Sequence, residues 1–139
     1  MYHKIILVGN LGRDPETRYT PSGQQVTNFS MATSEKWTGQ DGQLNERTIW
    51  WRVNVWGKTG ENCQKYLKKG SKVLVEGRMN ADPSGNPRIW TRQDGTAGAS
   101  FEVTAFTVKF LSSRGEGGGA PGGEVMEAEP PQDETEIPF

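Results

Sequence analysis

Residues 49 to 80 read IWWRVNVWGKTGENCQKYLKKGSKVLVEGRMN, and this stretch decides the fold because its period changes from strand to helix and back. Residues 49 to 56 alternate with the two-residue period of a β-strand. The two sides of that strand are Ile49, Trp51, Val53 and Val55, and Trp50, Arg52, Asn54 and Trp56. The first side predicts a core face, whereas the second is too polar for an interior and too aromatic for a surface that only meets water. We therefore expect the second side to contact a partner.

The residues that follow change to the period of a helix. In residues 58 to 70, Cys63, Tyr66 and Leu67 are spaced for one helical face, lysines gather toward the end, and Gly70 is a stop signal. We expect Cys63 to pack this helix against the rest of the domain. Residues 71 to 80 return to strand composition, so the stretch predicts strand, helix and strand in that order.

Strand patterns also lie on both sides of this stretch. They cover residues 4 to 10, 25 to 37 and 100 to 111. Residues 12 to 23 predict two turns around a brief extended piece, residues 38 to 46 an exposed hairpin loop, and residues 81 to 99 a long excursion marked by glycine and proline. Five strands with one helix between the third and the fourth is the order of an all-β OB-fold, a five-stranded Greek-key barrel. An immunoglobulin-like sandwich would need more strands.

The formal net charge of −1 on this 139-residue chain hides a strong asymmetry. Residues 1 to 114 contain 16 Lys and Arg against 10 Asp and Glu, a formal charge of +6, whereas residues 115 to 139 contain 7 acidic residues and no basic one. Glycine, proline and acidic residues dominate from residue 112 onward. We therefore expect one domain at 1 to 111 and a disordered tail at 112 to 139. A basic body with an acidic tail suggests a polyanion-binding domain and a separate interaction segment.

The composition disfavours several classes of function. No apolar run approaches the roughly 20 residues that cross a bilayer, so we expect a cytoplasmic protein that does not enter a membrane. A single cysteine, Cys63, and a single histidine, His3, cannot form an intramolecular disulfide or a Cys/His zinc site. The GNLG at residues 9 to 12 lacks the spacing of a P-loop. We therefore expect no metal, no cofactor and no enzymatic activity.

Four tryptophans are the candidate binding residues. They are Trp37, Trp50, Trp56 and Trp90. Each one alone can be core or edge filler, but all four have basic neighbours, which is typical of surfaces where unpaired bases stack on flat rings and cations contact the phosphates between them. Arg52 and Lys58 lie on the aromatic side of residues 49 to 58 or on its continuation, and Arg88 and Arg92 flank Trp90. Trp51, on the apolar side, is expected in the core or in a subunit contact.

Five segments together resemble one known family over nearly the whole chain. They read KIILVGNLGRDPETRYTPSG (4 to 23), FSMATSEKW (29 to 37), WWRVNVWGK (50 to 58), YLKKGSKVLVEGR (66 to 78) and EIPF (136 to 139). The sequence is similar to the bacterial single-stranded DNA-binding protein family. This resemblance implies an OB-fold, a homotetramer with single-stranded DNA wrapped around it, and an acidic tip that binds replication, recombination and repair proteins.

The resemblance also assigns roles to individual positions. Carried over, the stacking aromatics are Trp37, Trp50, Trp56 and Trp90, the contacts to the DNA backbone are Arg52, Lys58 and Lys69, and the subunit interface contains Trp51. The partner-binding tip comprises Glu134, Thr135, Glu136, Ile137, Pro138 and Phe139. The implied location is the cytoplasm, with association to the nucleoid through DNA.

Three features depart from the family's usual pattern. Trp56 stands where the family often has phenylalanine, the excursion from 81 to 99 is rich in glycine and proline, and the linker to the tip is short. A rival interpretation is an OB-fold interaction module, such as a primosome component or an RNA-binding regulator. That alternative shares the barrel and its charge, but it does not need the apolar Ile137, Pro138 and Phe139.

Overall fold

The computed structural model describes residues 1 to 112. The tail predicted at 112 to 139, including its tip at 134 to 139, therefore lies outside the described residues except for Ser112. The elements are β1 (Ile5–Leu11), β2 (Glu16–Tyr19), β3 (Gln25–Thr38), β4 (Leu44–Trp56), α1 (Gly57–Tyr66), β5 (Lys72–Met79), β6 (Ile89–Thr91), β7 (Ala97–Ala99) and β8 (Phe101–Phe110). Within residues 1 to 112, no helix is long and apolar enough to span a membrane.

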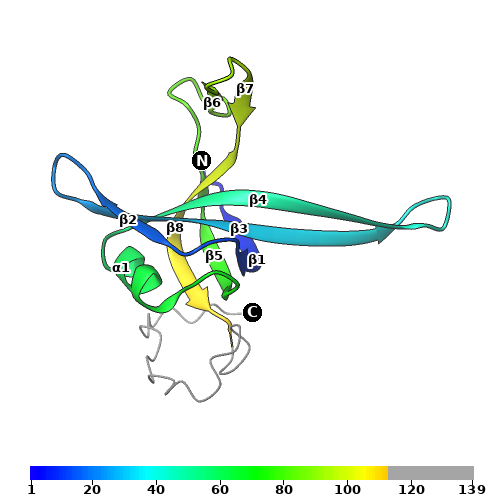
Figure 1. Cartoon of the computed structure of the whole chain (residues 1–139), viewed down its shortest axis with the longest axis horizontal. Coiled ribbons are helices and arrows are strands. Elements are labelled where there is room, and N and C mark those ends of the chain that lie inside the picture. The colour runs from blue at the N-terminus through cyan, green and yellow to red at the C-terminus, as the bar shows by residue number, and fades with distance from the viewer. Residues whose placement is uncertain (113–139) are drawn as a thin grey trace.

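Five of the strands close into a barrel (Figure 1). The order is β1-β5-β8-β4-β3, and β1 returns to β3 through the pairs Asn10 with Ala32 and Leu11 with Met31. All neighbours are antiparallel except β4 and β8, which are parallel, and β2 pairs with β3 outside the ring. The single described helix lies between the third and fourth barrel strands. The predicted OB-fold is therefore confirmed.

Apolar side chains on the inward side of the strands fill the barrel. Seven inward side chains on four strands and the helix cysteine are fully buried: Phe29, Met31, Val53, Val55, Val73, Val75, Val103 and Cys63. Leu67, 8% exposed, joins the same cluster immediately after α1. Burial of these side chains is the main favourable term in folding such a domain. The structure confirms that Val53 and Val55 face the core and that Cys63 packs the helix against the barrel.

The helix ends earlier than its sequence predicts, at Tyr66 instead of running to Gly70. The reason is tertiary, because the backbone N–H groups that would continue the helix are captured by other segments. Lys69 N–H donates to Asp14 Oδ1 at 2.8 Å, and Gly70 N–H donates to the carbonyl of Leu11 at 2.8 Å. The turn before β5 is thereby tied to the end of β1.

Two projections extend from the barrel (Figure 1). One is the outer part of the β3–β4 ribbon, whose strands run further than predicted, so that the exposed loop expected at 38 to 46 reduces to a turn at 39 to 43. The other is the excursion at 81 to 99, which contains the β6–β7 hairpin that the sequence did not predict. We call residues 81 to 99 the hairpin arm.

One turn type recurs four times: between β2 and β3, at the tip of the β3–β4 ribbon and twice in the hairpin arm. Residues 20–24, 39–43, 82–86 and 92–96 each close with a hydrogen bond from the first N–H to the fifth carbonyl and from the fourth N–H to the first carbonyl. The fourth residue is Gly23, Gly42, Gly85 or Gly95, with φ of 83°, 76°, 85° and 83°. Glycine adopts this left-handed conformation without a steric penalty, and the geometry is that of a type I turn followed by a bulge.

Candidate nucleic-acid interface

The outward side of β4 carries the aromatic and basic residues that the alternation predicted. Trp50 is 55% exposed and Trp56 is 45% exposed, and Arg52 lies on the strand between them. Opposite them on β3 stand Ala32, Ser30 and Val26, which are small enough to leave the rings uncovered. We call this surface the outer face of β4. It offers two flat rings with a cation between them.

A polar strip crosses the outer face between the two tryptophans. Asn54 of β4 is paired in register with Asn28 of β3, and Asn28 is paired with Glu16 of β2. With the Asn28 amide oriented to satisfy its neighbours, its nitrogen donates to Asn54 and its oxygen accepts from Arg18 Nη2 at 3.0 Å. Arg18 is a cation of this face that the sequence analysis did not single out.

Trp90 reaches the same face from the hairpin arm. It lies on β6 opposite Gly98 of β7, where a Cβ at residue 98 would stand 2.7 Å from the indole, so the glycine makes room for the ring. The guanidinium carbon of Arg52 lies 5.9 Å from the centroid of the Trp90 ring, within the range of a cation–π contact. The fold therefore brings Trp90 next to the centre of the outer face.

Trp37 stands apart from the other three tryptophans. By alternation it lies on the side of β3 that carries Phe29 and Met31, but beyond the barrel, where that side is open and Trp37 is 45% exposed. The guanidinium of Arg47 lies 5.5 Å from the ring centroid and its Nη2 is 2.8 Å from Glu35 Oε1. Arg47 was not a sequence candidate, because its alignment with Trp37 depends on the hairpin register.

The two candidate lysines lie at the ends of the outer face. Lys58 is in the first turn of α1, shortly after Trp56, and its Nζ is 3.5 Å from Glu61. Lys69 lies in the turn that Asp14 holds, and Asp14 is two residues from Gly12, against which the Trp50 ring packs. Both lysines are exposed to solvent.

Trp51 occupies the rim of the barrel on the inward side. It is half-buried, its Nε1 donates to Thr33 Oγ1 at 2.9 Å, and its ring centroid is 5.2 Å from that of Phe101. Phe101 itself remains 53% exposed. Trp51 thus packs against the edge of the core beside an open apolar residue, and its place in a subunit contact stays a prediction.

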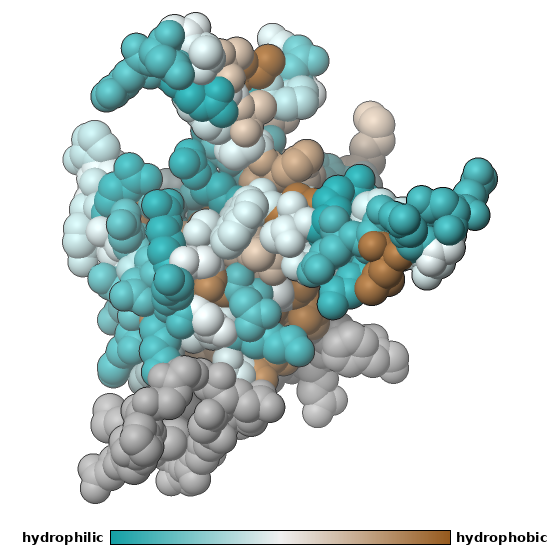
Figure 2. Space-filling view, turned by 45° about the vertical axis from the view of Figure 1, so that its right-hand side comes forward, coloured by the Kyte–Doolittle hydropathy of each residue, from teal (hydrophilic) through white to brown (hydrophobic). Residues whose placement is uncertain are grey.

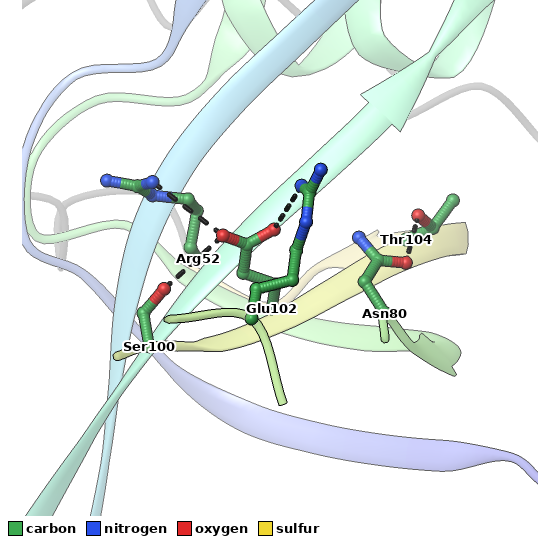
Figure 3. Close-up of polar contacts among 6 residues, drawn as sticks. Arg52, Asn80, Ser100, Glu102 and Thr104 are labelled. Carbon is green, nitrogen blue, oxygen red and sulfur yellow. Dashed lines mark hydrogen bonds and ion pairs between the residues drawn. The ribbon is translucent and has the colours of Figure 1, made fainter. Parts of the chain in front are cut away.

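Glu102 is a buried carboxylate on β8, in register with Arg52 of the outer face (Figure 3). It is 7% exposed, and its oxygens lie 3.8 Å from Arg52 Nη1 and 3.3 Å from Arg88 Nη1. Ser100 Oγ donates to the same carboxylate at 3.4 Å. Nothing local in the sequence marks this residue, because its two cations, Arg52 and Arg88, are distant from it along the chain.

Cys63 is the free cysteine of the described residues, and it is buried. Residues 1 to 112 contain no group of three His, Cys, Asp or Glu placed to hold a metal ion. Burial raises the pKa of the Cys63 thiol to about 12, so this cysteine is protonated and inert at neutral pH. The chemistry available at the outer face is stacking, cation–π contact and hydrogen bonding.

Comparison with known proteins shows the family of this chain. Residues 2 to 111 match the family model described as the single-strand binding protein family. The chain belongs to the single-strand binding protein family. That match spans all the described strands of the barrel and the hairpin arm. It leaves the tail outside.

Individual relatives in this family carry the name single-stranded DNA-binding protein. One from Neisseria meningitidis is 43% identical over 120 residues, which are 86% of this chain and 66% of the relative. One from Xanthomonas axonopodis is 44% identical over 115 residues, 83% of this chain and 61% of the relative. One from Wolinella succinogenes is 41% identical over 124 residues, which are 89% of this chain and 73% of the relative. The aligned parts thus span about two thirds of these proteins.

Solved structures of the family share the fold. The Plasmodium falciparum SSB in complex with ssDNA superposes with a TM-score of 0.67 and 27% identity, covering 81% of this chain and 97% of that one. A deletion mutant of the single-stranded DNA binding protein from Thermus aquaticus superposes with a TM-score of 0.64 and 28% identity. The alignment covers 81% of this chain and 51% of that one.

Proposed function

We propose that this protein binds single-stranded DNA with little sequence preference and carries out no catalysis. The observation that carries this proposal is the outer face of β4, where Trp50, Arg52 and Trp56 alternate and Trp90 lies beside Arg52. Unpaired bases stack on exposed rings whatever their sequence, at about 1–3 kcal/mol per base, and the cations between the rings neutralise phosphates. The family membership and the names of the relatives support this assignment.

Within this proposal the residues have separate roles. The stacking rings are Trp37, Trp50, Trp56 and Trp90, and the phosphate contacts are Arg52, Lys58 and Lys69. Arg47 extends the set because it stands beside Trp37, and Arg18 extends it because it bonds to Asn28 in the polar strip between Trp50 and Trp56. Trp37 would be reached by DNA that leaves the outer face along the β3–β4 ribbon.

A titration of tryptophan fluorescence tests the function. Oligo-dT should quench the intrinsic fluorescence strongly, and the affinity should fall with salt with a log-log slope of about −0.7 per phosphate neutralised. Duplex DNA of the same length and single-stranded RNA are the comparison ligands. Absence of quenching, or tighter binding to duplex, would exclude the proposal, and a preference for RNA would favour the rival RNA-binding module.

We further propose that the protein assembles into a homotetramer. The supporting feature is the exposed side of β1, where Ile6 is 57% exposed and Val8 is 47% exposed. From Ile5 to Gly9 the edge of β1 away from β5 pairs with no strand in residues 1 to 112. An apolar strip beside an open strand edge is suited to a second copy of the chain.

We also propose that the acidic tail recruits replication, recombination and repair proteins through residues 134 to 139. The support is compositional: seven acidic residues precede the apolar Ile137, Pro138 and Phe139 in a segment without basic residues. Acidic residues would steer the segment to a basic partner, and the apolar side chains would fill a pocket there. The cytoplasm is the location that these roles imply.

A further inference from the structure

The hairpin arm is joined to the barrel without any shared sheet. Among the described elements, β6 and β7 pair only with each other, and Figure 2 shows the arm as a lobe that stands above the barrel. A cavity of about 270 Å³ lies between the turn at Gly85 to Pro87 and the barrel residues Met79 and Phe101. Therefore neither strand pairing nor close side-chain packing holds the arm against the barrel.

The ion pairs at the junction of the arm and the barrel all involve one side chain. Arg88, at the base of the arm, donates to Glu102 Oε2 at 3.3 Å, and Arg52 of the barrel lies 3.8 Å from Glu102 Oε1. Arg52 in turn lies 5.9 Å from the Trp90 ring. Figure 3 shows Glu102 between the guanidinium of Arg52 on one side and a second guanidinium, that of Arg88, on the other.

The charges make this arrangement depend on the carboxylate. Glu102 is 7% exposed, and the guanidinium groups of Arg52 and Arg88 lie beside its two oxygens. Arg52 and Arg88 carry like charges and each lies near one oxygen of the Glu102 carboxylate, at 3.8 Å and 3.3 Å. The carboxylate therefore offsets the repulsion between the two cations and attracts Arg88, at the base of the arm, toward β8.

We propose that Glu102 is a positioning residue that latches the hairpin arm to the barrel and holds Trp90 over the outer face of β4. This inference rests on the proposed function, because its consequence is that a base can stack on Trp90 while a phosphate contacts Arg52. Glu102 itself touches no nucleotide. Its negative charge strengthens binding by keeping the binding surface assembled.

The decisive test compares Glu102→Gln with Arg88→Gln in oligo-dT titrations. A latch predicts that both substitutions weaken binding by about tenfold and that the double variant is no worse than either single one. Arg92→Gln is the matched control, because Arg92 lies on the same arm but its side chain bonds to Thr96 and Ala97 within the arm and not to the barrel. It removes the same charge and should cost no more than about threefold. Since Arg88 is 59% exposed, its variant should fold normally.

A different outcome would overturn the latch. If Glu102 merely masks two cations, Glu102→Gln should strengthen binding while Arg88→Gln weakens it. Opposite signs, or additive losses, would therefore contradict the proposal.

A second measurement separates the latch from the proposed function. In DNA-free protein labelled with 5-fluorotryptophan, the ¹⁹F resonance of Trp90, assigned with Trp90→Phe, should move toward the solvent-exposed position in both Glu102→Gln and Arg88→Gln. It should stay in place in Arg92→Gln. An unmoved Trp90 resonance in Glu102→Gln would exclude the latch even if the wild type binds DNA, and absent DNA binding by the wild type would exclude the function instead.

Discussion

The indole ring of Trp50 lies directly against Gly12: a Cβ at residue 12 would stand 2.4 Å from Cζ3 and 2.8 Å from Cη2 of that ring. Gly12 follows β1, and its N–H donates to the carbonyl of Ser30 at 2.9 Å. The backbone just after β1 thus packs against the ring of Trp50 on β4. The orientation of Trp50 depends on the absence of a side chain at residue 12.

Gly12→Ala should displace the Trp50 ring and weaken oligo-dT binding by about tenfold, which corresponds to the loss of roughly 1–2 kcal/mol of stacking. The free energy of unfolding should change by less than about 1 kcal/mol, because Gly12 has no positive φ and the half-exposed ring can swing into solvent. Fluorescence titration and urea unfolding measure the two effects. In a Trp50→Ala background the Gly12→Ala change should have no further effect on binding. An equal loss of oligo-dT affinity in that background would show that Gly12 does not act through the Trp50 ring.

Trp50 and Trp51 should separate DNA binding from assembly. Trp50→Ala removes an exposed ring and should weaken binding by about 1–3 kcal/mol without changing the oligomeric state. Trp51→Ala removes a half-buried ring that packs on Phe101 and should shift sedimentation at low protein concentration toward smaller species. If both variants change both properties equally, the assignment of the two faces is wrong.

Val8→Glu should dissociate the proposed tetramer. Val8 is 47% exposed on the outer side of β1, so the charge costs little in a single chain but would be buried without a partner in an assembly. Sedimentation velocity should show smaller species while circular dichroism stays unchanged. Leu44→Glu, at a residue that is 71% exposed near the end of the β3–β4 ribbon, is the matched control and should leave the assembly intact. A Val8→Glu protein with the wild-type sedimentation coefficient would disprove this interface.

Stability should fall at alkaline pH because of Cys63. Its thiol has a pKa of about 12 in the folded chain, raised by burial from 9.0, so between these values the unfolded chain loses the thiol proton while the folded chain keeps it. The stabilising contribution is complete below pH 9 and is lost as the pH rises, by up to about 1.4 kcal/mol per pH unit. Urea unfolding at pH 8 and pH 10.5, at one protein concentration, should show a smaller loss for Cys63→Ala than for wild type. Equal losses of unfolding free energy in wild type and Cys63→Ala would mean that the thiol does not contribute.

Removal of residues 134 to 139 should abolish binding to replication and repair proteins and leave oligo-dT affinity unchanged or slightly raised. The slight gain should be clearest at low salt, where attraction between the acidic segment and the +6 body is least screened. Pull-down and fluorescence titration on both proteins measure the two effects. If the shortened protein binds DNA less tightly and still retains the partners, the tail belongs to the DNA site.

The sequence alone determined the directions of side chains within each strand. Successive side chains of a strand point to opposite faces, so the alternation from Ile49 to Trp56 predicts a buried Val53 and an exposed Trp50 without knowledge of any neighbouring strand. Glycine and proline also marked the turns within residues 12 to 23 and the connections at 38 to 46 and 81 to 99, where the structure places glycines with positive φ. Strand order and the position of the helix then selected the OB-fold.

Tertiary structure decided where the predicted elements end and which side chains meet. The helix stops at Tyr66 because Asp14 and Leu11 capture the amides that follow. The β6–β7 pairing was hidden because each strand has 3 residues and β7 consists of small ones. Gly12 under Trp50, and Glu102 between Arg52 and Arg88, join residues that are distant in sequence. Periodicity fixes a side chain relative to its own strand, whereas such contacts depend on the register between strands, which only barrel closure sets.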